Sequence, residues 1–169
     1  GITGLTGVKQ IAAAAAHTLA LHEDGSVSAF GKNQKGQLGL GDEVGTGNVI
    51  SPTGITGLTG VKQLSQGLYH TLALHEDGSV FSFGHNNYGQ LGDGTSTNRD
   101  FMVQALLPYN DPAVSVETGE LHTCALLVSG EMRCWGQNSY AQLGTLTSTP
   151  TTHYVSVVVQ NLPIMFINI

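Results

Sequence analysis

Hydrophobic residues fall in short, strand-length runs along this chain, and polar or glycine-containing turns separate the runs. Residues 18–21 form one such run, an Asp-Gly turn follows at 23–25, and residues 26–30 form the next run. Two runs of this length around an Asp-Gly turn predict a β-hairpin. Another apolar run precedes the hairpin at 8–14, and a glycine-rich turn at 36–41 leads to a further extended segment. The pattern predicts three or four strands per unit and no substantial helix.

The same pattern recurs along the chain. The decapeptide GITGLTGVKQ occurs at 1–10 and again at 54–63, an offset of 53 residues. The segment that begins at His17 returns from His70 at the same offset, and a third copy begins at His122, 52 residues further on. One unit of this kind cannot bury both faces of its sheet alone, whereas stacked neighbours can. We therefore predict an all-β chain, a single array at 1–169 of tandem four-stranded antiparallel β-propeller blades. About three blades form an incomplete ring, with units at 8–60, 61–112 and 113–163 and the start of a further unit at 164–169.

A run of five alanines at 12–16 has high helix propensity. Its equivalents in the other units, at 65–69 and 117–121, are not helical sequences, so the repeat register predicts an inner strand here as well. The alternative is that these alanines stand for side chains that were not identified when the sequence was assigned.

Charge limits the partners of the chain. Charged residues make up 11% of the sequence, the formal net charge is −6, and the six Lys and Arg residues occur singly. Nucleic-acid backbones and anionic membrane surfaces attract clustered cations, so we predict no nucleic-acid partner. The most apolar stretch, 154–159, is far shorter than the roughly 20 residues of a membrane span, so we predict no membrane insertion. Because the sequence begins at Gly1 without Met, we interpret it as a processed product or a fragment of a longer chain.

The repeated residues resemble a known family. The pattern His-Thr-Leu-Ala-Leu, Asp-Gly-Ser-Val, Phe-Gly-x-Asn and Tyr-Gly-Gln-Leu-Gly at 70–92 is similar to the regulator of chromosome condensation repeat. All three units match this pattern, and the resemblance implies seven-bladed propellers, of which three units are less than half a ring. The units depart from it at 12–16, where the usual glycine before the histidine is missing, and at Lys35, Ser129 and Ala141.

Several positions recur once in every unit, and we predict that they form the structural framework of the blades. They are His17, His70 and His122, the aromatic residues Phe30, Phe83 and Trp135, and the glycines that follow these, Gly31, Gly84 and Gly136. Three histidines could in principle bind zinc. We favour histidines that hydrogen-bond to neighbouring strands, aromatic residues in the core between blades, and no metal or other cofactor.

Catalytic signals are weak. His22, Glu23 and Asp24 resemble acid–base residues, as do their equivalents at 75–77, but they lie beside hairpin turns, where exposed polar residues are common. No nucleophile accompanies them at a fixed spacing, so we predict no catalytic residue and no enzyme activity. The oxygen-rich stretch 93–100 is faintly like a calcium loop, but it does not match the EF-hand pattern and is also ordinary turn chemistry.

The two cysteines, Cys124 and Cys134, lie at equal distances from Ser129, the predicted hairpin turn. They therefore face each other on neighbouring strands, close to the separation that a disulfide requires. We favour a disulfide over the alternative of two buried thiols, and secreted members of the family have a similar Cys-Ala-Leu and Cys-Trp-Gly arrangement. A disulfide indicates an oxidising compartment, so we expect an extracellular or cell-surface location.

These observations favour a non-catalytic protein-interaction or assembly module that binds a protein partner or further copies of itself. The loops after each Gln-Leu-Gly, at 42–52, 94–100 and 145–153, differ most between units, and loops on a rigid scaffold carry function. Within them we predict contacts from Asp42, Glu43, Thr97, Arg99, Asp100, Thr147 and His153. The family resemblance implies an alternative, a guanine-nucleotide exchange factor that acts on a small GTPase. An enzyme or a lectin-like ligand binder is a third hypothesis, for which no set of converging polar residues can be named.

Overall fold

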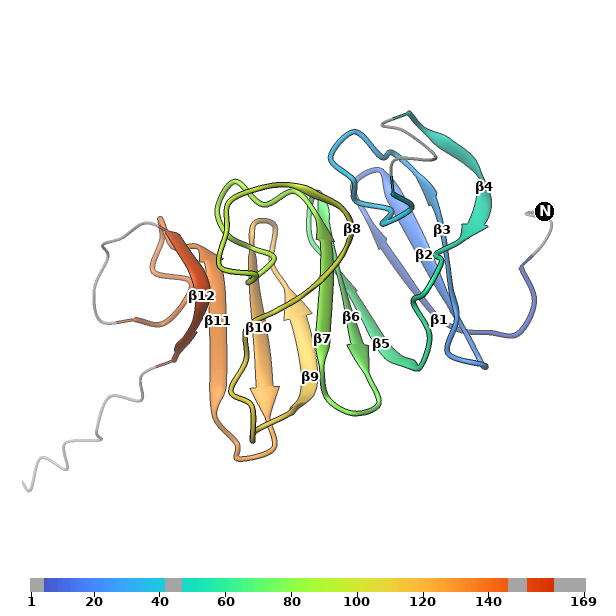
Figure 1. The fold of residues 1–169 in the computed structure, drawn as a ribbon. Helices are drawn as coiled ribbons and strands as arrows, with labels where there is room; N and C mark the ends of the chain where they lie inside the picture. The colour runs from blue at the N-terminus through green and yellow to red at the C-terminus, as the bar shows by residue number, and fades with distance from the viewer. Residues whose placement is uncertain (1–4, 42–46, 146–151, 160–169) are drawn as a thin grey trace, which may run out of the picture.

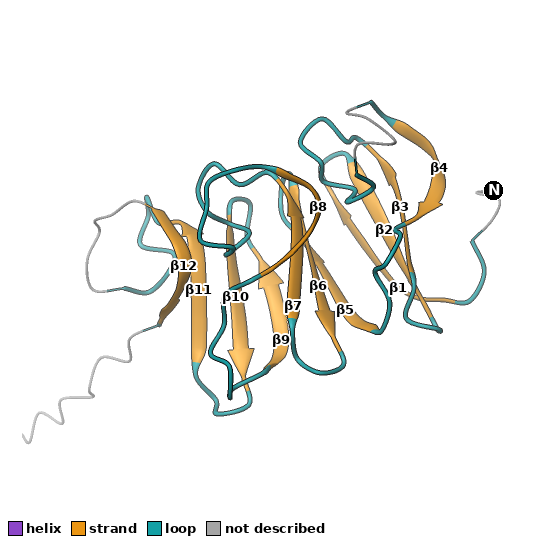
Figure 2. Cartoon of the chain, in the orientation of Figure 1, coloured by secondary structure: helices purple, strands orange, loops and turns teal. Residues whose placement is uncertain are grey.

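The structure is a computed structural model that describes residues 5–41, 47–145 and 152–159. These residues form twelve β-strands joined by loops and turns, and they contain no helix (Figure 2). The predicted all-β class is therefore confirmed. No helix long and apolar enough to cross a membrane occurs within this described part of the chain.

The strands form three separate four-stranded sheets, which we call blades 1, 2 and 3 (Figure 1). Within each blade the strands follow in chain order, and each pairs antiparallel with the next. Blade 1 contains β1 (Val8–Ala14), β2 (His17–His22), β3 (Val27–Gly31) and β4 (Val49–Gly54). Blade 2 contains β5 (Val61–Gln66), β6 (His70–His75), β7 (Val80–Gly84) and β8 (Arg99–Gln104). Blade 3 contains β9 (Ala113–Thr118), β10 (His122–Leu127), β11 (Met132–Gln137) and β12 (Thr152–Val158).

Neighbouring blades pack face to face, and the first strands β1, β5 and β9 lie next to one another. We call the face of a blade that meets the following blade its trailing face, and the opposite face its leading face. The apolar core lies between the blades in two clusters. The first cluster joins the trailing face of blade 1, including Leu19 and Leu21, to the leading face of blade 2, including Leu64 and Phe83. The second repeats this arrangement between blades 2 and 3 around the buried Trp135. The three sheets do not close into a ring, as predicted for an incomplete propeller.

The two ends of the blades differ in their connections. The tight turns between the second and third strands of each blade lie at one end, at the bottom of Figure 1, and we call it the turn end. The turns after β1, β5 and β9 and the long loops after β3, β7 and β11 lie at the other, the loop end. The alanines at 12–14 are part of β1, so repeat register rather than helix propensity determines their structure, whereas Ala15 and Ala16 form the turn before β2 and not the predicted strand. The segment 164–169, predicted to begin a further unit, lies outside the described residues.

Candidate functional site

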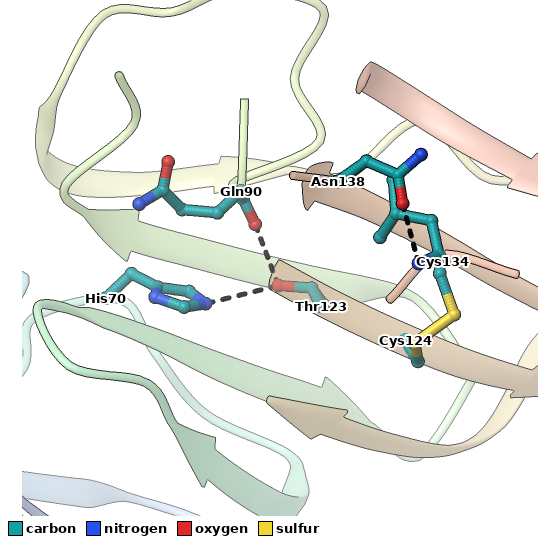
Figure 3. The surroundings of a disulfide bond; sticks show 7 residues. His70, Gln90, Thr123, Cys124, Cys134 and Asn138 are labelled. Carbon is teal, nitrogen blue, oxygen red and sulfur yellow. Dashed lines mark hydrogen bonds between the residues drawn. A yellow bond between two sulfur atoms is a disulfide. The ribbon is translucent and has the colours of Figure 1, made fainter. Parts of the chain in front are cut away.

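The repeated histidines link each blade to the next. His17 Nε2 lies 3.3 Å from Thr71 Oγ1, and His70 Nε2 lies 3.2 Å from Thr123 Oγ1. Each threonine hydroxyl donates its only hydrogen to a backbone carbonyl of the preceding blade, that of Gln37 or of Gln90, at 2.9 Å. The histidine Nε2 must therefore carry a proton and donate to the threonine, as Figure 3 shows for His70. Residues from two blades are thus joined in one buried network.

Burial keeps these histidines neutral. It lowers the pKa of His17 to about 4 and, with smaller contributions from neighbouring histidines, the pKa of His70 to about 3. Burial also lowers the pKa of the half-buried His122. The Nδ1 atoms of His17 and His70 are buried and meet no hydrogen-bond partner in the described residues. Each histidine lies in a different blade, and the described part of the structure holds no group of three or more His, Cys, Asp or Glu side chains suited to a metal ion.

A glutamine pair, which the sequence analysis did not identify, forms a second link between blades. The Gln10 side chain donates to the Leu64 carbonyl at 2.9 Å and accepts from the Leu64 N–H at 3.0 Å. Gln63 makes the same two bonds to Val116, at 2.9 and 3.2 Å. The signal was present in the sequence, since both copies of GVKQ end in this glutamine. The equivalent residue in blade 3 is Ser115, which is too short to make this pair of bonds.

The third link is the glycine-rich loop after the third strand, which lies on the next blade. A Cβ on Gly36 would come within 2.5 Å of Asp100 Cα, and one on Gly89 within 2.6 Å of Tyr154 Cα, so only glycine fits there. Further along the same loops, glycines lie against the rings of Phe83 and Trp135, and the Trp135 indole N–H donates to the Gln90 carbonyl at 2.9 Å. The equivalent of Gly36 and Gly89 in blade 3 is Ala141, which has a positive φ of 58° and is exposed.

The framework positions predicted from the repeat lie as follows. Phe83 and Trp135 are fully buried between blades, whereas Phe30, on the leading face of blade 1, is half-buried. Gly31, Gly84 and Gly136 all have φ between 104° and 107°, and a side chain at each would collide with the backbone of the turn before the second strand. These glycines allow the third strand to leave the sheet at the loop end.

The residues predicted to contact a partner are dispersed. Thr97 is exposed at the loop end, whereas Arg99 and Asp100 begin β8. The Asp100 carbonyl accepts the Gly41 N–H at 2.8 Å, and His153, in β12, lies against the loop that contains Gly89. These three therefore contact the preceding blade. Asp42, Glu43 and Thr147 lie outside the described residues.

The stretch with calcium-like composition is organised by an ion pair. Arg99 donates to Asp93 Oδ2 from Nε at 3.0 Å and from Nη2 at 2.8 Å, while Asn86 and Thr95 donate to Oδ1. Burial raises the pKa of Asp93, but hydrogen bonds from Thr95 and Arg99 outweigh it and hold the pKa below its ordinary value. Protein donors thus already occupy both carboxylate oxygens, and they fix the shape of this loop.

A serine–histidine contact lies at the turn end of blade 1. Ser28 Oγ is 2.9 Å from His22 Nε2, and His22 Nδ1 is 2.8 Å from the Thr6 carbonyl. A carbonyl at Nδ1 requires the proton there, so Nε2 accepts from the serine. Asp24, the nearby carboxylate, instead accepts from Ser26, and the serine position is occupied in blade 2 by Phe81, which packs on His75. The pair therefore lacks the buried carboxylate that stabilises a charged imidazole in serine hydrolases.

Cys124 and Cys134 face each other on β10 and β11, and their sulfurs form a disulfide with an S–S distance of 2.04 Å (Figure 3). Cys124 occupies the position of Leu19 and Leu72, which are core residues on the trailing faces of blades 1 and 2. The disulfide therefore lies on the trailing face of blade 3, where a following blade would pack.

Three sheets with this repeated set of links define a propeller of the regulator of chromosome condensation type. The sequence profiles of the regulator of chromosome condensation (RCC1) repeat match residues 8–37, 61–90 and 113–142 and, in a second profile, residues 24–74 and 77–126. The chain belongs to this repeat family.

Curated relatives match the chain over part of their length. The ultraviolet-B receptor UVR8 of Arabidopsis thaliana is 36% identical over 81% of this chain and 31% of its own length. Human protein RCC2 is 36% identical over 77% of this chain and 25% of its own length. The human probable E3 ubiquitin-protein ligase HERC3 is 38% identical over 76% of this chain, which corresponds to 12% of that protein. The chain thus spans about a third or less of these relatives.

Solved structures agree with the fold. Human WBSCR16 superposes with a TM-score of 0.77 at 26% identity, covering 89% of this chain and 37% of that one. Yeast RCC1 (Prp20), in its complex with Kap60, gives a TM-score of 0.80 at 24% identity, covering 94% of this chain and 38% of that one. The propeller fold is therefore shown, while the number of blades in a complete ring stays a prediction.

Proposed function

We propose that the chain is a non-catalytic protein-interaction module whose loop end binds the partner. The observation that carries this proposal is a contrast between the two ends of the blades. The turn-end sequence His-Glu-Asp-Gly-Ser is identical in blades 1 and 2, at 22–26 and 75–79, whereas blade 3 has Leu-Val-Ser-Gly-Glu at 127–131. At the loop end, equivalent positions differ even between blades 1 and 2: Ala16 is replaced by Tyr69, and Lys32 by His85. A fixed scaffold that presents varied side chains at one end is suited to recognition.

Replacing the loop 94–98 by a Gly-Ser segment of equal length tests this proposal. The matched control replaces Glu76 and Asp77, exposed at the turn end, by glutamine and asparagine. Proteins cross-linked to the chain are identified, purified and titrated against each variant. We expect the loop variant to bind a purified partner more weakly and the turn-end variant to bind it with unchanged affinity. The reverse pattern would place binding at the turn end and contradict the proposal.

The family does not supply a catalytic role for this chain. The relative named as a probable ligase is HERC3, and the chain matches only 12% of the length of that protein. Relatives of this family also suggest regulation of a small GTPase, and that class is the second candidate. A nucleotide-release assay with purified small GTPases separates the two classes, because accelerated release at catalytic amounts of the chain would establish exchange activity.

We further propose that the chain functions in an extracellular or cell-surface compartment. The disulfide between Cys124 and Cys134 supports this, because such bonds persist in oxidising compartments. Intact mass measured on native material, alkylated without reductant, tests the proposal. The expected mass carries no alkyl group, and two alkylated thiols would contradict it.

We further propose that copies of the chain associate through the blade faces at the ends of the array. Ile11, on the leading face of blade 1, and Leu126 and Met132, on the trailing face of blade 3, are exposed in this structure. Ala141 opposes head-to-tail packing in the register of the internal interfaces, since the equivalent glycines leave no room for a methyl group. Sedimentation of the chain and of Ala141→Gly tests this, and we expect the glycine variant to associate more strongly. Two variants that both stay monomeric at high concentration would exclude self-association.

A further inference from the structure

Two of the six Lys and Arg residues of this acidic chain meet at the loop end, at the junction of blades 1 and 2. Lys32 Nζ lies 5.3 Å from the centre of the Tyr69 ring, and the Tyr69 ring meets His85 edge to face at 6.3 Å. Tyr88 also meets His85 edge to face, at 6.3 Å. Lys35 is exposed beside them, close enough to His85 to act on it electrostatically. We call Lys32, Lys35, Tyr69, His85 and Tyr88 the loop-end patch.

The orientation of His85 is fixed from beneath the patch. The Tyr88 N–H donates to Gln90 Oε1 at 3.0 Å, which orients the buried amide, and Gln90 Nε2 then donates to His85 Nδ1 at 2.9 Å. The His85 proton is therefore on Nε2, and no group in the described residues accepts it. Burial, followed by the positive charge of Lys35, lowers the pKa of His85, so the ring is neutral at pH 7. The patch thus offers one oriented N–H donor beside two tyrosine rings.

Neither lysine of the patch forms an ion pair with a described residue. The ion pairs of the described residues are Arg99 with Asp93 and Arg133 with Glu131. Glu120 is the exposed carboxylate on the adjoining turn after β9, whose carbonyl accepts the Leu68 N–H at 3.0 Å. Asp100, in β8, lies against Gly36, the residue after Lys35, and most other described carboxylates, including those of the Asp-Gly turns, are at the turn end. The patch therefore has two lysines without an ion pair, with Glu120 and Asp100 at its border.

We propose that the loop-end patch binds an acidic peptide segment, with the two lysines and the His85 N–H holding its carboxylates and the tyrosine rings covering its aliphatic groups. This deepens the proposed interaction function and rests on it. Two lysines and one neutral donor suit a few spaced carboxylates. A nucleic-acid backbone instead requires a longer track of cations and would meet the net charge of −6. Tyr88 is repeated as Tyr140 in blade 3, but the equivalents of Tyr69 and His85 there are Leu121 and Gln137, so within the described residues the full combination occurs at one blade junction.

The test uses a fluorescein-labelled nonapeptide of alternating glutamate and leucine, with its glutamine counterpart as the uncharged probe. Binding is followed by anisotropy, and contact is followed by NMR of the His85 and Tyr69 ring protons. Lys32→Glu with Lys35→Glu is expected to weaken binding of the acidic peptide by about tenfold or more, as charge reversal at one half-buried and one exposed lysine predicts. The matched control, Lys9→Glu with Lys62→Glu, changes the net charge equally at two exposed lysines of β1 and β5 and is expected to change binding less than about twofold.

A second variant guards against misfolding and tests the aromatic part of the patch. Tyr69→Leu keeps the net charge and removes the ring beneath Lys32. It is expected to weaken binding of the acidic peptide several-fold while the circular dichroism spectrum is retained. The proposal would be overturned if the two double lysine variants weakened binding of the acidic peptide equally. It would also be overturned if the glutamine peptide bound as tightly as the acidic peptide. Tighter binding of a fluorescein-labelled single-stranded oligonucleotide than of the acidic peptide would also overturn it. If the patch does not bind the acidic peptide as proposed, but the loop 94–98 variant still binds a purified partner more weakly, the proposed interaction function stands without the patch.

Discussion

The trailing faces of blades 2 and 3 are built from equivalent positions, yet one is closed and the other is open. On blade 2, Leu74 is 0% and Val80 1% exposed, because blade 3 covers them. Their equivalents on blade 3, Leu126 and Met132, are both 43% exposed. The apolar pattern of a blade is therefore the same whether or not a neighbour is present, and burial comes from the neighbour. This is the expected behaviour of a repeat array, in which each unit is stabilised mainly by the units beside it.

The two faces also differ in the residues that fasten one blade to the next. Blade 2 has Gln63, Leu72 and Gly89 at positions where blade 3 has Ser115, Cys124 and Ala141. Of the links described above, blade 3 retains His122 but has neither the glutamine pair nor the glycine that permits close approach. The trailing face of blade 3 therefore cannot repeat the internal interface without adjustment, and variants at these positions measure each link separately.

The largest effect is expected from pH, through the histidines of the closed interfaces. Unfolded histidine titrates near pH 6.5, whereas the pKa is lowered to about 4 for His17 and about 3 for His70 in the folded chain. As pH falls below 6.5 the unfolded chain binds protons that the folded chain does not, so stability is full above that pH and falls as pH decreases. At pH 5 the loss is about 2 kcal/mol for each histidine, or about 4 kcal/mol together. Urea denaturation between pH 7.5 and 4.5 measures it.

His70→Gln and His122→Gln separate the closed face from the open one in that experiment. Glutamine keeps a donor for Thr123 but cannot titrate, so His70→Gln should remove a large part of the pH dependence. His122 is half-buried at the open face, and replacing it should remove less. The aspartates with lowered pKa, among them Asp24 and Asp77, lose their stabilising hydrogen bonds only below about pH 4, outside this window. Identical pH slopes for the two variants would contradict the assignment of the buried pair.

The next largest effect is expected where the glycine-rich loop of blade 2 lies on blade 3. Gly89→Ala puts a methyl group within 2.6 Å of Tyr154 Cα and forces a side chain onto a φ of 75°, so it should cost about 3 kcal/mol. The matched control is the reverse change at the open face, Ala141→Gly, which relieves a positive φ of 58° and should stabilise the chain by less than about 1 kcal/mol. Thermal unfolding of both variants gives the comparison. A loss at Gly89 no larger than the gain at Ala141 would show that blades 2 and 3 do not pack as described.

Reducing the disulfide should destabilise the chain by roughly 2.5 kcal/mol, the chain-entropy value for a loop of this size. The two cysteines are 10 residues apart and join the hairpin of the blade that has one open face. Hydrogen exchange with and without reductant should show the change in β10 and β11 and little change in β6 and β7. The hairpin of blade 2 is the internal reference, because Leu72 and Ser82 occupy the same positions without a covalent link. Equal changes in both hairpins would mean that the disulfide stabilises the whole array rather than its own blade.

The sequence was sufficient for the blades but not for the contacts between them. Alternation and the Asp-Gly turns predicted the strands, and the symmetry about Ser129 brought Cys124 opposite Cys134, because these relations lie within one hairpin. The glutamine pair and the loop-end patch join residues of two neighbouring repeats, and only the packing of two sheets brings them together. A pattern within one repeat therefore does not predict these contacts.

Variation between repeats proved an ambiguous signal for the partner-binding loops. Arg99 and Asp100 differ from their equivalents in the other blades, which is why they were predicted to contact a partner. In the structure Arg99 holds Asp93 within its own loop, and the Asp100 carbonyl accepts the N–H of Gly41 from the preceding blade. Residues therefore differ between repeats for two reasons, because each loop fits its own neighbour and because it faces solvent. Sequence alone does not separate these reasons, whereas burial and contact do.

The smallest effect is expected from the glutamine link, where the two faces can be compared by truncation. Gln63→Ala leaves the N–H and the carbonyl of Val116 without their partners at the inner edge of the closed interface, so it should cost about 2 kcal/mol. Ser115→Ala at the equivalent position of the open face should change stability by less than about 0.5 kcal/mol. Denaturation of the two variants under the same conditions measures the difference. Because the closed and open faces carry the same backbone at this position, a similar small effect of both truncations would mean that water replaces the glutamine, and that apolar burial and the histidine network alone hold blades 2 and 3 together.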